Sequence, residues 1–318
     1  LIERETETFT PFSDYDTFFG DYNGDGIERR RNRLAFAGEW RGVFGDRLAL
    51  SAGVRRDNND SFQDFTTWRT SASYDLKETG TRPHASMGTG VKIPGMYEQF
   101  GANQINYENN PNLRPETSRG FDVGVEQRFL GGRATVDVTY FNNRLQDAIT
   151  PFGFNPATFR TRAENVDGIS RRQGVEVATR YLVSSALSLG LSYTYTDARQ
   201  PDGTREFRRT PHSGRADVRY LFNEGKGTVS FGVVANGRTP DVVFANPSYA
   251  RSRLELDGYW LVQAAASYKV APNVEIYGRI ENMLNQKYQE IYGYSAARLG
   301  AYAGVKINFD TAPSGALK

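Results

Sequence analysis

Apolar and polar residues alternate along stretches of about ten residues throughout this chain, the length of a strand that crosses a membrane. In the segment 187–195, for example, Leu187, Leu189 and Leu191 alternate with small polar residues such as Ser188. Successive side chains of a β-strand point to opposite faces, so this pattern predicts a strand with one apolar and one polar face. Strands of soluble sandwiches are usually shorter, nearer five or six residues.

The pattern predicts about thirteen such strands between residues 33 and 309. The opposite faces of these strands carry charged residues such as Asp122, Asp217 and Glu275. A charge costs several kcal/mol where it faces lipid but little where it faces a wet lumen. The thirteen proposed lipid-facing sets begin at Leu34, Leu48, Trp68, Ala85, Phe121, Ala134, Val175, Leu187, Ala216, Val229, Val262, Val274 and Leu299.

The connections between these stretches alternate in length. Gly45-Asp46 and the segment 223–226 are short, whereas 93–118, 145–168 and 238–256 are long. Outer-membrane barrels have short periplasmic turns and long extracellular loops. The sequence therefore predicts an all-β fold, a transmembrane antiparallel β-barrel, whose last strand ends on the periplasmic side.

Composition supports a barrel and excludes other classes. Mean hydropathy is −0.59, and no apolar run approaches the ~20 residues that a membrane helix needs. Aromatic residues make up 13% of the 318 residues, as interfacial girdles require. The net charge is only +2, so no broad basic field favours a nucleic-acid partner, and the chain contains no cysteine.

Several segments together resemble one family, the TonB-dependent outer-membrane receptors, and most closely its cobalamin-receptor-like branch. The order and spacing of these segments match from about residue 33 to residue 309. The segments are TGVKIPGMYEQFG at 89–101, NPNLRPETSRGFDVGVE at 110–126, GISRRQGVEV at 168–177, DGYWLVQAAASYKV at 257–270, VEIYGRIENMLNQKYQEIYGY at 274–294 and GAYAGVKINF at 300–309.

The resemblance implies a 22-stranded barrel around an N-terminal plug, of which this chain holds about 13 C-terminal strands. Residues 1–309 would form the partial barrel, with 1–10 as the end of the strand before the thirteen, and residues 310–318 would form a tail. The plug and the energy-coupling box would lie upstream. No export signal precedes the first strand, so we expect a mature, truncated chain.

The function implied by the resemblance is TonB-dependent active uptake of a scarce nutrient across the outer membrane of a Gram-negative bacterium. The nutrient would be a cobalamin-like corrinoid or a ferric siderophore. The other partners would be lipopolysaccharide, outer-membrane lipid and, through the missing N-terminal part, the TonB energy-coupling complex. The alternatives are a passive porin-like channel, if the natural protein lacks a plug, an outer-membrane barrel enzyme, and a soluble all-β binding protein, which the lipid-facing stripe argues against.

Aromatic residues recur in the long connections, where they are suited to contact a large ligand. The alternative is that they form the upper aromatic girdle. The proposed ligand-binding residues are Tyr97, Phe100, Tyr107, Phe152, Phe154, Phe159, Phe244, Tyr249 and Tyr292.

Arginines are also dense near these connections, at 29–33, 205, 208–209, 251 and 253. They would attract an anionic chelate or bridge lipopolysaccharide phosphates, or else form solvated loop charge.

Residues 21–26 match the first half of a calcium loop. Asp21, Asn23 and Asp25 supply oxygen ligands at positions 1, 3 and 5, and Gly26 stands at position 6. Position 12, however, is Asn32 rather than Glu. The hypotheses are a calcium site, which would be the one cofactor of the chain, or a polar turn.

Catalytic signals are weak. The two histidines, His84 and His212, fall near strand starts and outside any recognisable Ser/Asp arrangement. No Gly-rich phosphate loop or metalloprotease motif is present. The sequence therefore predicts a protein that is not an enzyme.

Overall fold

The computed structural model describes residues 1–10, 15–17, 20–22, 27–101, 107–245 and 250–309. The elements of the first half are β1 (Ile2–Phe9), β2 (Tyr15–Thr17), β3 (Gly20–Tyr22), β4 (Arg29–Phe44), β5 (Leu48–Asn59), β6 (Phe65–Tyr74), β7 (Thr81–Lys92), α1 (Met96–Phe100), β8 (Tyr107–Glu108), β9 (Glu116–Phe129), the 3-10 turn η1 (Leu130–Gly132), β10 (Ala134–Gln146), β11 (Ile149–Asn155) and β12 (Arg160–Asn165). The second half contains β13 (Ile169–Leu182), β14 (Leu187–Arg199), β15 (His212–Phe222), β16 (Gly227–Asn236), β17 (Thr239–Ala245), β18 (Ala250–Leu256), β19 (Tyr259–Ala271), β20 (Val274–Glu281) and β21 (Gly300–Ile307).

Fourteen of the described strands form one sheet in the order β1-β4-β5-β6-β7-β9-β10-β13-β14-β15-β16-β19-β20-β21. Apart from β1, these are the thirteen strands that the alternation predicts. β1 pairs antiparallel with β4 and places Ile2 opposite Phe36, so the prediction of an additional strand within residues 1–10 is confirmed. Residues 310–318, the predicted tail, lie outside the described residues.

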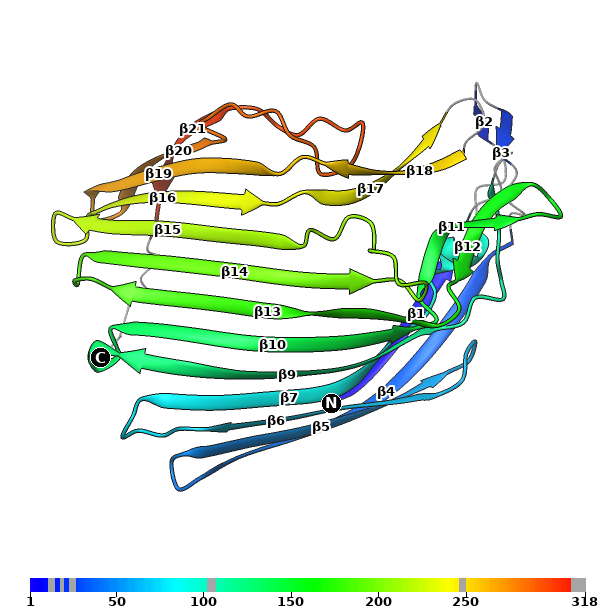
Figure 1. Ribbon diagram of the computed structural model, residues 1–318, viewed down its shortest axis with the longest axis horizontal. Coiled ribbons are helices and arrows are strands. Elements are labelled where there is room, and N and C mark those ends of the chain that lie inside the picture. The colour runs from blue at the N-terminus through cyan, green and yellow to red at the C-terminus, as the bar shows by residue number, and fades with distance from the viewer. Residues whose placement is uncertain (11–14, 18–19, 23–26, 102–106, 246–249, 310–318) are drawn as a thin grey trace, which may run out of the picture. The chain divides into compact units, whose positions relative to one another are not determined.

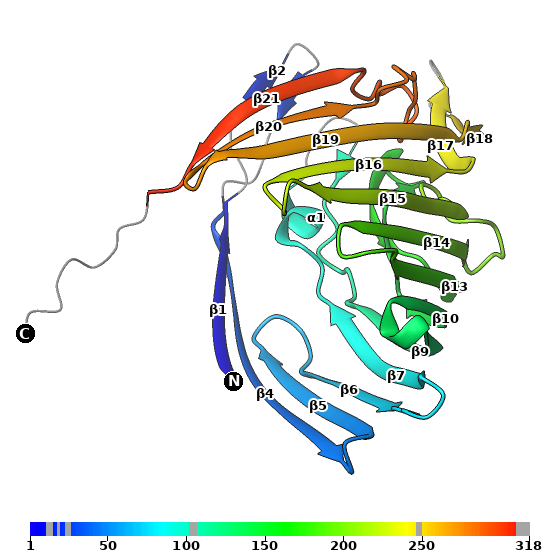
Figure 2. The ribbon, with the colours of Figure 1, turned by 90° about the vertical axis from the view of Figure 1, so that its left-hand side faces the viewer.

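The chain divides into two compact units. Unit 1 comprises Leu1–Val125, Thr139–Gln173 and Asp197–Arg205, and unit 2 comprises Glu126–Val138, Gly174–Thr196 and Glu206–Lys318. β1 and β4–β7 belong to the first unit, and β15, β16 and β19–β21 belong to the second. Figure 1 shows β15 and β16 running side by side in unit 2, and Figure 2 shows β19 beside β20 and β20 beside β21.

The strand register of unit 1 separates apolar from polar side chains, because directly opposite residues of an antiparallel pair share a face. Trp40 lies opposite Ala52, and Val54 lies opposite Trp68. On the other face Ser51 lies opposite Ser71, and their hydroxyl oxygens are 2.7 Å apart. We call these the apolar face and the polar face of the sheet.

Unit 2 repeats this separation over six strands. One row of directly opposite residues crosses β14, β15, β16, β19, β20 and β21 on the apolar face. Its members are Leu189, Val218, Phe231, Ala264, Ile280 and Ala301. On the polar face Glu275 lies opposite both Lys269 and Lys306. The predicted period of two is therefore confirmed in both units.

The short connections are tight turns. The Arg47 backbone N–H donates to the Phe44 carbonyl at 3.2 Å between β4 and β5, and the two central residues of this turn, Gly45 and Asp46, have positive φ values of 55° and 53°, as in a type I′ turn. We call the strand ends with short connections the turn end and the opposite strand ends the loop end.

The long connections contain regular structure of their own. β8, β11 and β12 form a three-stranded sheet, β17 pairs with β18, and β2 pairs with β3. Segments 145–168 and 238–256, which the sequence marks only as long loops, are therefore hairpins. Within the described residues, no helix is long and apolar enough to cross a membrane.

Candidate ligand-binding site

The sheet of β8, β11 and β12 forms a hydrogen-bonded platform at the loop end of unit 1. β11 and β12 are antiparallel, and β12 adds β8 in parallel through Thr161 and Arg162. Glu108 of β8 accepts hydrogen bonds from the Asn155 side chain at 2.5 Å and from the Thr158 hydroxyl at 2.7 Å. These hydrogen bonds lower the pKa of Glu108, so its carboxylate is charged at neutral pH and holds β8 to the hairpin.

The base of this hairpin is fixed to the segment that leads into β9. The Asn165 side chain accepts a hydrogen bond from the Arg114 backbone N–H at 2.8 Å and donates to the Asp147 carbonyl at 2.7 Å. The Arg114 guanidinium also contacts Asp147 at 2.7 Å. Because these contacts already hold the hairpin in place, a ligand that binds at its tip causes little further loss of conformational entropy.

Two of the predicted ligand-binding residues meet on this hairpin. Phe154 in β11 and Phe159 just before β12 have ring centroids 6.3 Å apart in an edge-to-face arrangement. Phe154 is 54% exposed and Phe159 is 79% exposed, so the pair offers apolar surface to solvent. Phe159 has a positive φ of 56°, a conformation that bulky residues rarely adopt and that is often found at functional sites.

The short helix α1 carries two more predicted residues, and they differ. Tyr97 is 61% exposed. The Phe100 ring lies instead under the guanidinium of Arg29, 4.4 Å from its carbon, so it supports the wall of unit 1. Beside it, buried Gln99 accepts a hydrogen bond from Arg31 at 2.7 Å and donates to the Pro111 carbonyl at 3.0 Å, which fixes the helix in place.

A buried carboxylate organises the loop end of unit 2. Asp241 in β17 has no exposed surface, and it accepts hydrogen bonds from the Tyr292 backbone N–H at 2.7 Å and from Arg208 at 2.9 Å. Burial alone would raise the pKa of Asp241, but these donors and the Val242 backbone N–H outweigh burial and lower it. Three chain segments are thus joined through one charged side chain.

The connection 282–299 is held by side chains rather than by regular structure. Buried Asn282 accepts from the Gln286 backbone N–H at 2.9 Å and donates to the Ala297 carbonyl at 3.2 Å. The Tyr259 ring packs on the Tyr288 ring with centroids 4.3 Å apart. Burial, together with the nearby Glu290, raises the pKa of Tyr288.

A cavity of about 710 Å³ lies between this connection and the end of β18. Its wall includes Tyr288 and the predicted Tyr292, which is 49% exposed, together with cationic and anionic side chains. Such a wall suits a large ligand with both apolar and polar surface. The other lining side chains that carry charge or hydrogen-bonding groups are Glu255, Asp257, Lys287, Gln289, Ser295 and Arg298.

The remaining predicted residues are described in part or not at all. The backbones of Tyr107, Phe152 and Phe244 lie in β8, β11 and β17, but their side chains lie outside the described residues. Tyr249, and with it Asn23 and Asp25 of the predicted calcium loop, also lie outside, whereas Asp21 belongs to β3 by its backbone. Among described residues no group of three or more His, Asp or Glu side chains is arranged to hold a metal ion.

Sequence reasoning missed the residues that shape the cavity of unit 2. Asp241 reads as an ordinary loop acid, and its signal was weak, a single carboxylate followed by Val242 and Val243 in a stretch interpreted as a loop. Lys287 and Arg298 are 11 residues apart and face one cavity only because the Asn282 hydrogen bonds fold the connection back.

Comparison with known proteins supports this architecture. The family model described as "TonB dependent receptor-like, beta-barrel" matches residues 4–283. The vitamin B12 transporter BtuB of Vibrio cholerae is 26% identical over 92% of this chain and 45% of that protein. That of Photobacterium profundum is 27% identical over 82% of this chain and 40% of that protein. The chain therefore spans less than half the length of these relatives.

Among solved structures, the siderophore receptor PirA from Acinetobacter baumannii superposes with a TM-score of 0.77, over 97% of this chain and 51% of that one, at 15% identity. Likeness at that identity shows the fold alone, and the fold is that of a transmembrane barrel whose C-terminal strands this chain supplies. Because the family model spans most of the strands described above, the chain belongs to the TonB-dependent receptor-like β-barrel family.

Proposed function

We propose that this chain is the C-terminal part of an outer-membrane receptor of a Gram-negative bacterium that takes up a scarce nutrient with energy from the TonB complex. The observation that carries the proposal is the difference in structure between the loop end and the turn end. Hydrogen-bonded hairpins and a connection held by Asn282 and Asp241 present aromatic rings and a cavity with charges of both signs, whereas the described strands are joined at the turn end by short connections. Fixed aromatic surface at one end of a barrel serves ligand capture. The proposed activity is binding and transport, without a chemical step.

The proposed ligand is a cobalamin-like corrinoid, with a ferric siderophore as the competing candidate. The corrinoid is supported by the similarity to the vitamin B12 transporter of Vibrio cholerae, and the siderophore by the fold shared with the siderophore receptor PirA. The two differ in charge. A corrinoid is large, amphipathic and weakly charged, so exposed rings should contribute more than arginines, whereas an anionic iron chelate should depend on arginines and weaken with salt.

Full-length receptor carrying Phe154→Ala and Phe159→Ala is expected to bind cyanocobalamin roughly tenfold more weakly, since two exposed rings of the capture surface are removed. The measurement is a titration at low and at moderate salt, in which the wild-type affinity should stay nearly constant. Phe129→Ala is the matched control, because Phe129 is 47% exposed at the turn end.

No binding of cyanocobalamin by the wild-type receptor at micromolar ligand would remove the corrinoid and leave the iron chelate. If Phe129→Ala weakened cyanocobalamin binding as much as the Phe154→Ala and Phe159→Ala pair, the assignment of ligand binding to the platform of β8, β11 and β12 would be wrong.

We also propose that Asp21, Asn23 and Asp25 bind calcium through their side-chain oxygens. Chelation of calcium is then expected to increase protease cleavage within residues 11–32 of the full-length receptor. Asp25→Asn should show the same increase with calcium present. Cleavage at the same rate with calcium and with chelator would support a simple polar turn.

A further inference from the structure

Three arginines stand on the apolar face of the sheet, near the loop end of unit 1. They are Arg119 in β9, Arg144 in β10 and Arg171 in β13, and all three are exposed. Each falls in the same alternation as apolar residues of its own strand, namely Phe121, Tyr140 and Val175. Most charged side chains of the strands instead lie on the polar face.

Contacts between β9 and β10 place Arg119 opposite Arg144. A carbon added to Gly124 would meet the Thr139 hydroxyl, and one added to Gly120 would lie 3.4 Å from Asn143 Cγ. These two contacts give one register, and that register sets Arg119 against Arg144 one residue further along.

The register between β10 and β13 likewise places Arg171 beside Arg144. The Asn142 amide on β10 donates to Gln173 on β13 at 3.0 Å, so these two side chains are neighbours on the apolar face. Arg144 and Arg171 each lie two residues closer to the loop end. The three guanidinium groups therefore form one row across three neighbouring strands, which we call the arginine row.

No protein carboxylate compensates this row. Neither an ion pair nor a hydrogen bond involves the three guanidinium groups within the part of the chain that the structure describes. On β9, β10 and β13 the alternation places no acidic residue on the apolar face. The acids at the loop ends of β9 and β10 already have partners, since Glu116, the first residue of β9, contacts Lys92 and Asp147, just after β10, contacts Arg114.

Like charges directly opposite each other destabilise a sheet, so a counter-charge from outside the chain would stabilise this row of three cations. The nearest acid of the next strand, Asp197 in β14, is held by Arg199 at 2.9 Å. A negative charge that compensates the row would therefore come from a molecule that lies against the apolar face.

The depth of the row matches a membrane surface. A membrane strand crosses in roughly 9–11 residues, and this is the separation between Arg119 and Phe129 at the turn end. Trp68, a residue type that gathers at membrane interfaces, lies at the same level, because its backbone N–H contacts the hydroxyl of Thr89, the β7 neighbour of Arg119, at 3.2 Å.

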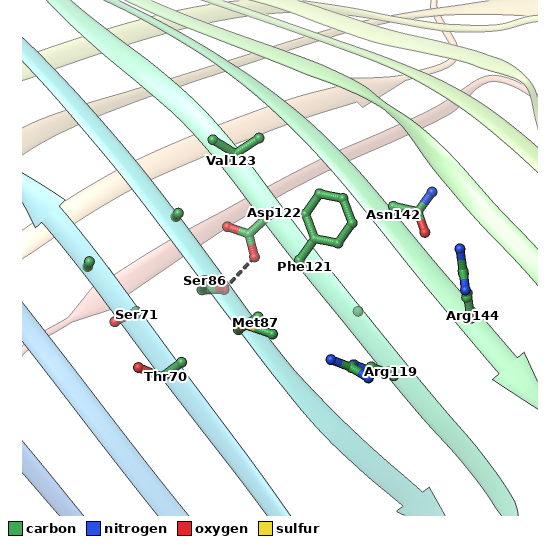
Figure 3. A pocket seen from close by; sticks show the side chains of 13 residues that line it. Thr70, Ser71, Ser86, Met87, Arg119, Phe121, Asp122, Val123, Asn142 and Arg144 are labelled. Atoms are coloured by element: carbon green, nitrogen blue, oxygen red, sulfur yellow. Dashed lines mark hydrogen bonds between the residues drawn. The ribbon is translucent and has the colours of Figure 1, made fainter.

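A groove of about 830 Å³ runs from the row along the apolar face (Figure 3). Arg119, Arg144 and Asn142 line it together with Met87, Phe121 and Val123. The lining also includes Asp122, which belongs to the polar alternation of β9 and whose carboxylate accepts a hydrogen bond from the Ser86 hydroxyl. Next to it, the side chains of Asn142, Tyr140 and Gln173 are joined by hydrogen bonds of 3.0 to 3.2 Å. The groove thus combines cationic, neutral polar and apolar side chains.

We infer that the arginine row and its groove bind a phosphorylated glycolipid of the outer leaflet, of the lipid A type. The guanidinium groups hold its phosphates through charge-assisted hydrogen bonds, and one acyl chain lies along Met87 and Phe121. The inference rests on the proposed outer-membrane location, and it assigns a site on the lipid side, separate from the capture surface of the loops.

The test uses full-length receptor in phosphatidylcholine vesicles with a small fraction of diphosphoryl lipid A, and it measures the lipid A retained per receptor by native mass spectrometry. Combined replacement R119Q, R144Q and R171Q is expected to lower retention about tenfold or more. The control R69Q, R180Q and R219Q removes the same charge from the polar face and should retain lipid A as wild type does. Dephosphorylated lipid A should bind wild type as weakly as diphosphoryl lipid A binds the R119Q/R144Q/R171Q variant.

Retention unchanged in the R119Q/R144Q/R171Q variant, or equal retention of dephosphorylated lipid, would overturn the inference. Displacement of lipid A by millimolar inorganic phosphate would reduce the row to a simple anion site and would also overturn it. Cyanocobalamin binding should be the same in both triple variants and wild type, so failure of the lipid site and failure of the proposed ligand are separate results.

Discussion

Replacement of Ala264 by arginine is expected to lower the free energy of unfolding of the reconstituted full-length receptor by about 2–4 kcal/mol. Ala264 lies in the middle of β19, directly opposite Phe231 and Ile280, within the apolar row of unit 2. A guanidinium at that depth has neither water nor a carboxylate to contact. The measurement is equilibrium unfolding in lipid vesicles.

The matched control is Ser267→Arg, three residues further along β19. Ser267 lies opposite Thr228 and Tyr277 on the polar face, so the same charge would enter a wet lumen. That variant should stay within about 0.5 kcal/mol of wild type. Equal losses from the two substitutions would show that the two faces are wrongly assigned.

Asp241→Ala should have the second large effect, at the loop end of unit 2. The change leaves the Tyr292 and Val242 backbone N–H groups without their acceptor, and it removes the partner of Arg208. We expect local opening of 282–299 to become easier by about 2–4 kcal/mol, because each unsatisfied buried donor costs about 1–3 kcal/mol. Hydrogen exchange of the Tyr292 amide measures this opening directly.

Protonation of Asp241 should act in the same direction as its replacement. Its pKa is lowered in the folded protein, so the stabilisation is complete above the unfolded value of about 4 and is lost as pH falls through the folded pKa. Protection of Tyr292 in wild type should thus be constant near neutral pH and fall in acid. Glu255→Ala, which removes an exposed acid from the neighbouring β18, should leave that protection unchanged. A pH-independent protection would mean that another contact holds the connection.

The barrel strands were predictable from the sequence because each strand is two-sided. Leu189, Val218, Phe231 and Ala264 are apolar for the same reason, exposure to lipid, and a period of two is visible without knowledge of their partners. The turn at Gly45 and Asp46 was likewise readable from two residues. The hairpin β17–β18 was not, because it does not alternate between lipid and lumen and offers no such period.

The candidate site was predictable only by residue type. Phe154 and Phe159 were chosen as loop aromatics, and they do meet at an exposed tip. Phe100 was chosen on the same ground but packs under Arg29 in unit 1. Phe100 differs from Phe154 and Phe159 because it contacts a residue that is distant in sequence, and residue type alone does not predict such a contact. The same holds for Asp241, whose role depends on Arg208 and Tyr292, both remote in sequence.

The pairing of β16 with β19 across a long insertion has an entropic consequence. Their register runs without interruption from Gly227 opposite Tyr268 to Asn236 opposite Tyr259, although the whole β17–β18 hairpin lies between them in sequence. Each doubling of such a closed segment costs only about 0.6 kcal/mol, which a ten-residue ladder easily absorbs. Lengthening or exchanging that hairpin should therefore leave the strand ladder intact. Changes in ligand preference that arise in the hairpin should accordingly lower the thermal stability of the barrel very little.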